Sequence, residues 1–212
     1  MDHAAWLKTV WRGRIRAQRR DRPQPDPLGH QQPIPGLAAV LPDAGERVAA
    51  FESVGSEPST VALLAGLAAD GLRILVPARS GAGGEGWGEP AWVEVLTATC
   101  ALPVPPTASR LPSQAVQPGR GQVLEAEALG QCQLILVPAL AVDRSGTRLG
   151  QGGGWYDRAL THRGPGALTL AVCYPHEVLP GGVLPRETHD LMVDGALTAR
   201  GVELFDTPQN AL

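Results

Sequence analysis

The amino-acid sequence predicts an α/β fold in the form of a single three-layer αβα domain with a mostly parallel central sheet. Continuous apolar runs at residues 72–78 (LRILVPA), 133–140 (QLILVPAL) and 167–174 (ALTLAVCY) are typical of strands that are buried on both faces. Segments with helical character alternate with these runs, and such alternation places strands parallel in one sheet. The length, 212 residues without an internal repeat, indicates one candidate domain over residues 1–212.

The N-terminal segment, residues 1–20, is basic, and a helix is expected over residues 4–20. Trp6 and Val10 are four residues apart and share one helical face, while five arginines lie at other positions of this segment. Prolines are concentrated in residues 21–36, which predicts a loop or linker after this helix.

The rest of the chain is expected to form one longer helix, two connections and several shorter elements. A helix is expected to begin near Pro58, which suits a first helical turn, and to stop at Gly71, which suits a C-cap. Residues 80–90 are rich in glycine, and residues 101–121 are rich in proline and polar residues, so both are expected to be connections. The shorter expected elements are strands at 48–54, 91–96 and 191–198 and a helix from about Trp155 to His162.

The overall composition excludes several classes of protein. A net charge of −3 creates no field that would recruit nucleic acid or a membrane, and 43% hydrophobic residues indicate a globular chain. No apolar run approaches the roughly 20 residues of a membrane span, and the N-terminus lacks the apolar centre of a signal peptide. Cys100, Cys132 and Cys173 are scattered, which suits a reducing compartment. We therefore expect a cytoplasmic protein without nucleic-acid or membrane partners, as a monomer or weak homodimer.

The most informative stretch is the glycine-rich segment that follows the strand at 133–140. Four of the five residues 150–154 are glycines, so backbone N–H groups there can approach an anion closely. Arg148 can grip a phosphate with two donors, and Asp157 at the start of the next helix could hold Mg²⁺. The segment matches neither the Walker A pattern nor the dinucleotide fingerprint. It indicates a phosphate site, with a flexible glycine turn and a capping aspartate as the alternative.

The same stretch resembles the signature of the 5-formyltetrahydrofolate cyclo-ligase family. Val137-Pro138-Ala139-Leu140 is followed at the family's spacing by Asp143, Gly146, Arg148, Leu149, Gly150, Gly152, Gly154, Tyr156 and Asp157, with Trp155 replacing the family's first tyrosine. Three more segments resemble family motifs: Lys8 to Arg12, Phe51 to Thr60, and His189 to Asp194 with Thr198.

The resemblance implies an ATP- and Mg²⁺-dependent enzyme that cyclises a reduced formyl folate, 5-formyltetrahydrofolate, to 5,10-methenyltetrahydrofolate and releases ADP and phosphate. It implies Arg148 as the main catalytic residue. The ATP-binding residues that it implies are Lys8, Arg12, Arg148, Leu149, Gly150, Gln151, Gly152, Gly153, Gly154, Trp155 and Tyr156. The implied folate-binding residues are Phe51, Glu52, Glu57, Gly152, Trp155 and Tyr156, and the implied metal ligands are Asp157 and Asp194.

Each role has a plain structural alternative. Glu57 could be an ordinary first-turn glutamate, and the aromatic pair could be core packing. Either aspartate could cap a helix or end a strand. His189 and Asp190 are expected to shape a turn, and the other helix arginines, Arg14, Arg16, Arg19 and Arg20, are expected to be surface charge. For the whole chain, the alternatives are a folate-binding relative without turnover and a different ATP-dependent small-molecule ligase.

Overall fold

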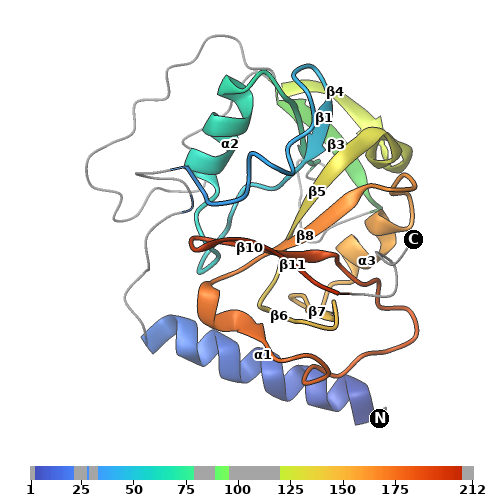
Figure 1. Ribbon diagram of the computed structural model, residues 1–212. Helices are drawn as coiled ribbons and strands as arrows, with labels where there is room; N and C mark the ends of the chain where they lie inside the picture. Colours follow the sequence, from blue (N-terminus) through green and yellow to red (C-terminus); the bar gives the residue numbers. More distant parts are fainter. Residues whose placement is uncertain (1–2, 22–27, 29–32, 79–88, 96–119, 207–212) are drawn as a thin grey trace.

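The structure, a computed structural model, is built around an eight-stranded sheet (Figure 1). It describes residues 3–21, 28, 33–78, 89–95 and 120–206. In sheet order the strands are β11 (Gly201–Leu204), β10 (Gly195–Thr198), β8 (Leu168–Val172), β5 (Cys132–Pro138), β1 (Arg47–Ala49), β2 (Arg73–Pro77), β3 (Ala91–Val95) and β4 (Arg120–Glu125). A three-stranded sheet contains β7 (Arg148–Leu149), β6 (Ala141–Asp143) and β9 (Val178–Leu179). The helices are α1 (His3–Asp21), α2 (Val61–Ala69), α3 (Trp155–Leu160) and the 3-10 helices η1 (Ala126–Gln131) and η2 (Pro175–Glu177).

The inner strands of the large sheet run parallel. β10, β8, β5, β1 and β2 pair in that order, while β11 at one edge and β3 and β4 at the other are antiparallel. The register pairs Leu134 of β5 with Leu168 of β8, and Val48 of β1 with Ile74 of β2. The predicted α/β fold with a mostly parallel sheet is confirmed.

Alternating side chains of the central strands form two hydrophobic layers. Leu134 and Leu136 of β5 pack on the side of the sheet where α2 contributes Leu63. Ile135 of β5 points to the other side, where α3 contributes Leu160. Because successive strand residues point to opposite faces, an unbroken apolar run can supply both layers. Helices thus cover both faces of the sheet, as the three-layer prediction requires (Figure 1).

Helix α1 covers the small sheet and not the large one (Figure 1). Its Ile15 packs against Leu149 of β7 and neighbouring residues of that sheet. Trp6 and Val10, the expected apolar face, are 51% and 49% exposed. The helix instead turns Lys8, Ile15 and Arg19 inward, at a spacing of one or two turns. Among the described residues no helix is long and apolar enough to cross a membrane.

Several element boundaries differ from the prediction. β1 ends at Ala49, well short of residue 54, because the chain then turns through Val54 to Glu57. The last predicted strand begins at Gly195 instead of residue 191. The helix predicted to stop at Gly71 ends at Ala69, and Gly71 has a φ of +79°. The antiparallel edge strands β4 and β11 and the whole small sheet were not predicted. The expected connections at 21–36, 80–90 and 101–121 lie largely outside the described residues.

The hairpin of β10 and β11 provides a test of the edge geometry. A Cβ at Gly195 would lie 2.4 Å from the carbonyl oxygen of Glu203, so alanine must push the hairpin apart. We expect Gly195→Ala to lower the free energy of unfolding by about 1–3 kcal/mol, measured by urea denaturation. The control is Gly13→Ala in α1, where a Cβ meets nothing within 4 Å. That control should raise stability by up to about 1 kcal/mol. A Gly195→Ala protein as stable as the parent would contradict this packing.

Candidate active site

The turn between β6 and β7 is organised by the buried carboxylate of Asp143. One oxygen accepts the backbone N–H groups of Ser145 at 3.1 Å and Thr147 at 3.3 Å, and also the Ser145 hydroxyl. The other oxygen accepts the backbone N–H of Leu184 at 2.9 Å. A carboxylate that satisfies several backbone donors fixes a turn firmly. Asp143 therefore sets the position of β7 and of Arg148, its first residue.

Arg148 is the central charged group of the glycine segment. Its side chain is only 4% exposed, and its Nη2 donates to Asp157 Oδ1 at 3.0 Å. Its Nη1 donates to the carbonyl oxygen of Pro138 at 3.2 Å, and its guanidinium lies 5.8 Å from the centre of the Tyr156 ring. The side chain thus joins the end of β5 to the first turn of α3. A Cβ at Gly150 would lie 2.8 Å from Arg148 Nη1, so this position needs glycine.

Helix α1 brings two more cations to the glycine segment. Arg12 Nε donates to the carbonyl oxygen of Gly150 at 3.0 Å, and Arg16 Nη2 donates to both the backbone and side-chain oxygens of Gln151. Burial lowers the pKa of Arg12, as does the charge of Arg16, while Asp190 and nearby carboxylates oppose that shift. Arg16 was predicted to be surface charge; it is exposed, but it contacts the loop directly. Its position one turn after Arg12 is the signal that could have identified it.

Lys8 is held by carboxylates in this structure. Its ammonium group lies 2.5 Å from Glu187 Oε2 and 2.5 Å from Asp190 Oδ2. Asp190 also accepts the backbone N–H of Glu187 at 2.6 Å, so it shapes this turn as predicted. Glu187, His189 and Asp190 form the group of potential metal ligands found among the described residues. Glu187 and Asp190 thus join the site, and the His189-Asp190 pair of the family-like segment was the signal for Asp190.

The two carboxylates predicted to hold a metal have different surroundings. Asp157 is 28% exposed and pairs with Arg148. Asp194 is buried, and its Oδ2 accepts the backbone N–H of Thr169 at 2.8 Å, within the sheet. A metal role for Asp194 therefore stays a prediction, and a bound metal would have to share this carboxylate with the N–H of Thr169. Asp190 lies four residues earlier, and its negative charge partly opposes the lowering of the Arg12 pKa by burial.

Glu57 lies in a tight turn at the end of the segment that follows β1. Its Oε2 accepts the backbone N–H of Val54 at 3.0 Å. Burial raises the pKa of Glu57, and the bond from Val54 and the nearby side chain of Gln151 partly oppose the shift. Ser53 and Thr60 close the base of the turn by exchanging backbone-to-hydroxyl bonds of 3.0 and 3.2 Å. The glycine segment therefore meets the predicted folate carboxylate through Gln151.

The aromatic residues divide between packing and the site. Trp155 is buried and contacts the ring of Trp92 edge-on at 5.2 Å, so core packing explains its position. Burial raises the pKa of Tyr156, and the charge of Glu57 raises it further, while Arg148 lowers it. Tyr156 thus lies within the fields of both charged groups.

The other predicted substrate residues are less involved. Phe51 is 4% exposed and packs in the layer beside α2, and its carbonyl oxygen accepts the Thr60 hydroxyl at 2.8 Å. Glu52 is exposed. Leu149 is buried against α1. Gly152, which has a φ of +107°, packs beside the Arg12 guanidinium, where a Cβ would lie 3.4 Å from its central carbon.

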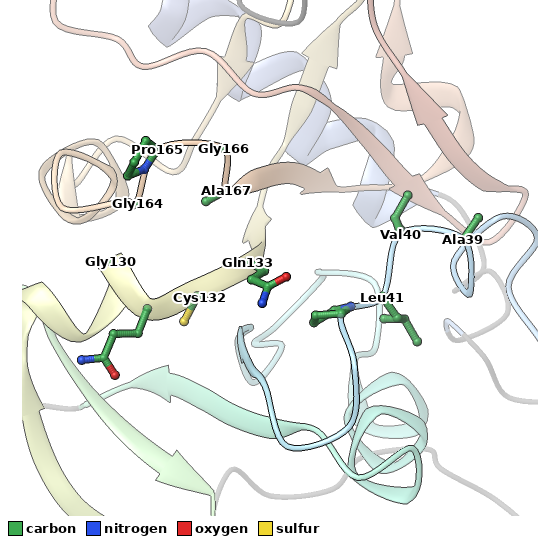
Figure 2. A pocket seen from close by; sticks show the side chains of 12 residues that line it. Ala39, Val40, Leu41, Gly130, Cys132, Gln133, Gly164, Pro165, Gly166 and Ala167 are labelled. Carbon is green, nitrogen blue, oxygen red and sulfur yellow. The ribbon is translucent and has the colours of Figure 1, made fainter.

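A pocket of about 440 Å³ opens near the amino ends of the central strands β5 and β8, at the opposite end of these strands from the glycine segment (Figure 2). Its walls are residues 39–42, 130–133 and 164–167, and none of these carries a charge. Burial raises the pKa of the Cys132 thiol to about 12, so this cysteine is unreactive. The charged side chains described above, those of Arg12, Arg16, Arg148 and Asp157, lie instead around the glycine segment, which follows the carboxyl end of β5. Ligands of open α/β sheets bind at this end of the strands.

Comparison with known proteins gives consistent matches. A model of the 5-formyltetrahydrofolate cyclo-ligase family matches residues 5–199. A 5-formyltetrahydrofolate cyclo-ligase of Mycolicibacterium smegmatis is 36% identical over 198 residues, covering 91% of this chain and 94% of the relative. One of Mus musculus is 39% identical over 87 residues, covering 38% and 41%.

Two solved structures of 5,10-methenyltetrahydrofolate synthetases share the fold. The protein of Aquifex aeolicus matches with a TM-score of 0.64 at 21% identity, covering 94% of this chain and 93% of that one. The protein of Mycoplasma pneumoniae matches with a TM-score of 0.56 at 16% identity, covering 88% and 95%.

The surroundings of Asp194 generate a prediction about stability. Asp194→Asn replaces a charged acceptor of a buried backbone N–H with a weaker one, which should lower the free energy of unfolding by about 1–3 kcal/mol in urea denaturation. The control is Asp70→Asn at the exposed end of α2, which should stay within about 0.5 kcal/mol of the parent. An unchanged midpoint for Asp194→Asn would mean that the charge of Asp194 adds nothing to its bond with Thr169.

Proposed function

The chain belongs to the 5-formyltetrahydrofolate cyclo-ligase family and is a ligase, and from this premise we propose that it converts 5-formyltetrahydrofolate to 5,10-methenyltetrahydrofolate with ATP and Mg²⁺, releasing ADP and phosphate. The observation that carries the proposal is that Gln151 of the glycine segment accepts a hydrogen bond from Arg16 of α1 and lies close enough to Glu57 to oppose the rise that burial causes in the pKa of that carboxyl. A cationic site suited to phosphates therefore adjoins a buried carboxylate suited to a pterin. Two substrates bound there would meet.

The phosphates of ATP would be held by Arg148, Arg12 and the backbone N–H groups of residues 150–154. Phosphoryl transfer spreads negative charge over several oxygens, and a fixed guanidinium can follow two of them. Arg148 is buried, so its charge acts in a medium of low polarity and needs no reorganisation. For Lys8, a phosphate would compete with the carboxylates that now hold its ammonium group.

The folate would be held through its pterin. An aminopyrimidine edge presents two adjacent N–H donors, which one carboxylate such as Glu57 can accept. Glu57 is 9% exposed, and a charged hydrogen bond gains strength where water is excluded. The ring of Tyr156 offers a flat apolar face next to this carboxylate and to Arg148.

Magnesium would be held by Asp157 together with Asp190. Carboxylate oxygens are the ligands that Mg²⁺ prefers, and both carboxylates act on Arg12, the residue that contacts Gly150. Asp157 uses one oxygen for Arg148, and Asp190 lies within a group of three potential ligands. The carboxylate oxygens present here, including that of Glu187 beside Asp190, are of the kind that Mg²⁺ takes. When bound, Mg²⁺ would neutralise part of the charge on the phosphates.

The chemistry requires activation of a poor electrophile. In the proposed reaction the formyl oxygen attacks the γ-phosphorus of ATP, ADP leaves, and the formyl group becomes an imidate phosphate. N10 then attacks the formyl carbon and loses its proton, and the C–O bond breaks so that phosphate departs as the ring closes. The contribution of the protein is to orient the two substrates and to stabilise charge on the transferring group. The proposed reaction needs no covalent enzyme intermediate.

Turnover tests the proposal directly. Mixing the protein with 5-formyltetrahydrofolate and Mg-ATP should produce the absorbance of methenyltetrahydrofolate. Arg148→Ala should lower kcat on the order of 10³-fold, because it removes a transition-state cation, and Arg148→Lys should recover only part of the loss. Lys8→Ala should mainly raise the KM for ATP. Circular dichroism and thermal melting of each variant would separate lost catalysis from lost folding.

Two outcomes would contradict this assignment. Binding of 5-formyltetrahydrofolate without turnover by the parent protein would indicate a folate-binding relative. Normal kcat for Arg148→Ala at saturating ATP would leave Arg148 as a binding residue only.

The metal assignment has its own test. Asp157→Asn and Asp190→Asn should each raise the Mg²⁺ concentration that gives half-maximal turnover, because each removes an anionic oxygen ligand. Asp194→Asn should lower stability and leave the Mg²⁺ dependence unchanged, since its carboxylate bonds to Thr169. Titration of turnover with Mg²⁺ at saturating ATP checks this. A shift confined to Asp194→Asn would restore Asp194 as the ligand and exclude Asp190.

A further inference from the structure

A buried ion pair joins the end of α1 to the segment after β8. Arg19 Nε donates to Glu177 Oε1 at 2.7 Å and Arg19 Nη2 donates to Glu177 Oε2 at 2.8 Å, with both side chains 1% exposed. The same Nη2 donates to the carbonyl oxygen of Ala139 at 2.8 Å. Arg19 was predicted to be surface charge, and that prediction is wrong. Sequence spacing alone could not reveal that Glu177 lies opposite.

Tyr174 is the residue that both partners of this pair hold. Its backbone N–H donates to Glu177 Oε2 at 2.8 Å, and its ring lies 5.2 Å from the Arg19 guanidinium. Its hydroxyl donates to the carbonyl oxygen of Ser56 at 3.3 Å. The acceptor belongs to the peptide immediately before Glu57. A physical connection therefore runs from α1 to the turn that carries the proposed folate carboxylate.

The arrangement of the ion pair suits a positioning role better than a stabilising one. Taking two charges out of water is costly, and apolar residues of similar size are often as stable or more so. Arg19 Nη1 is also buried without a hydrogen-bond partner among the described residues, so the pair is not fully satisfied. The ion pair instead fixes the orientation of Arg19, because its bidentate contact with Glu177 holds the guanidinium over the Tyr174 ring.

We infer that Arg19, Glu177 and Tyr174 form a positioning relay that holds the Ser56–Glu57 peptide, and with it the carboxylate proposed to bind the pterin. The inference rests on the proposed function, in which Glu57 binds the pterin. Helix α1 would then serve both substrates: Arg12 and Arg16 contact the glycine segment, and Arg19 sets the place of Glu57. None of the three relay residues needs to touch a substrate.

Tyr174→Phe is the sharpest test, because it removes only the hydroxyl that reaches Ser56. We expect the dissociation constant for 5-formyltetrahydrofolate, measured by calorimetry, to rise about two- to ten-fold. The KM for ATP and kcat should change less than about two-fold. The matched control is Thr169→Val, which removes a buried hydroxyl contacted by Arg163 near the start of β8, the strand that precedes Tyr174. This control should alter melting temperature alone.

Arg19→Met tests the rest of the relay. It should weaken folate binding by more than Tyr174→Phe does and lower the melting temperature, because it leaves Glu177 buried without its partner. Adding Glu177→Gln removes that charge while keeping an oxygen for the Tyr174 N–H. The double variant should recover most of the lost melting temperature but not the folate affinity. Recovery of both together would show that the pair acts on stability only and would overturn the relay.

Glu57→Gln separates failure of the relay from failure of the proposed function. If Glu57→Gln binds 5-formyltetrahydrofolate as tightly as the parent, the folate role of Glu57 is wrong, and the relay falls with it. If Glu57→Gln binds weakly while Tyr174→Phe and Arg19→Met bind normally, the relay alone is overturned.

Discussion

The burial of the Arg148 guanidinium is the constraint on which the rest of the site depends. A charge that is 4% exposed must have acceptors, and Arg148 takes them from the end of β5 and the first turn of α3. Those two elements are thereby fixed relative to each other. The same side chain occupies the space beside Gly150, which excludes any Cβ there. The glycine segment is thus shaped from the inside by the buried guanidinium of Arg148.

The site also depends on a balance between positive and negative side chains. Lys8, Arg12 and Arg16 lie on one helix and converge on the same region, and like charges in one place repel. Glu187, Asp190 and Asp157 offset that repulsion in the free protein. An incoming triphosphate brings the same sign of charge as these carboxylates and can replace them as partner of the cations. In the proposed function, the carboxylates would then be free to hold a cation of higher charge, as binding of Mg-ATP would require.

The sequence predicted the features that are decided locally. The runs that became β2, β5 and β8 are mostly apolar because the sheet buries them on both faces, and Gly71 marks a helix end through its own backbone geometry. The phosphate-binding role of the glycine segment and Arg148 stays a prediction. The features that the sequence did not predict depend on contacts between residues that are far apart in the sequence. Edge strands such as β11 are short and half-exposed, and the burial of Arg19 depends on Glu177, 158 residues away.

Residues 190 and 194 show why spacing within a motif cannot decide a role. Asp190 ends a turn, where its side chain reaches across to Lys8 of α1. Asp194 stands directly before β10, where the backbone is already committed to the sheet and the nearest donor is the N–H of Thr169. The four-residue interval crosses the boundary between a turn and a strand, so the two carboxylates leave the chain in different surroundings. One remains able to exchange its partner for a ligand, and the other is needed to keep a buried donor satisfied.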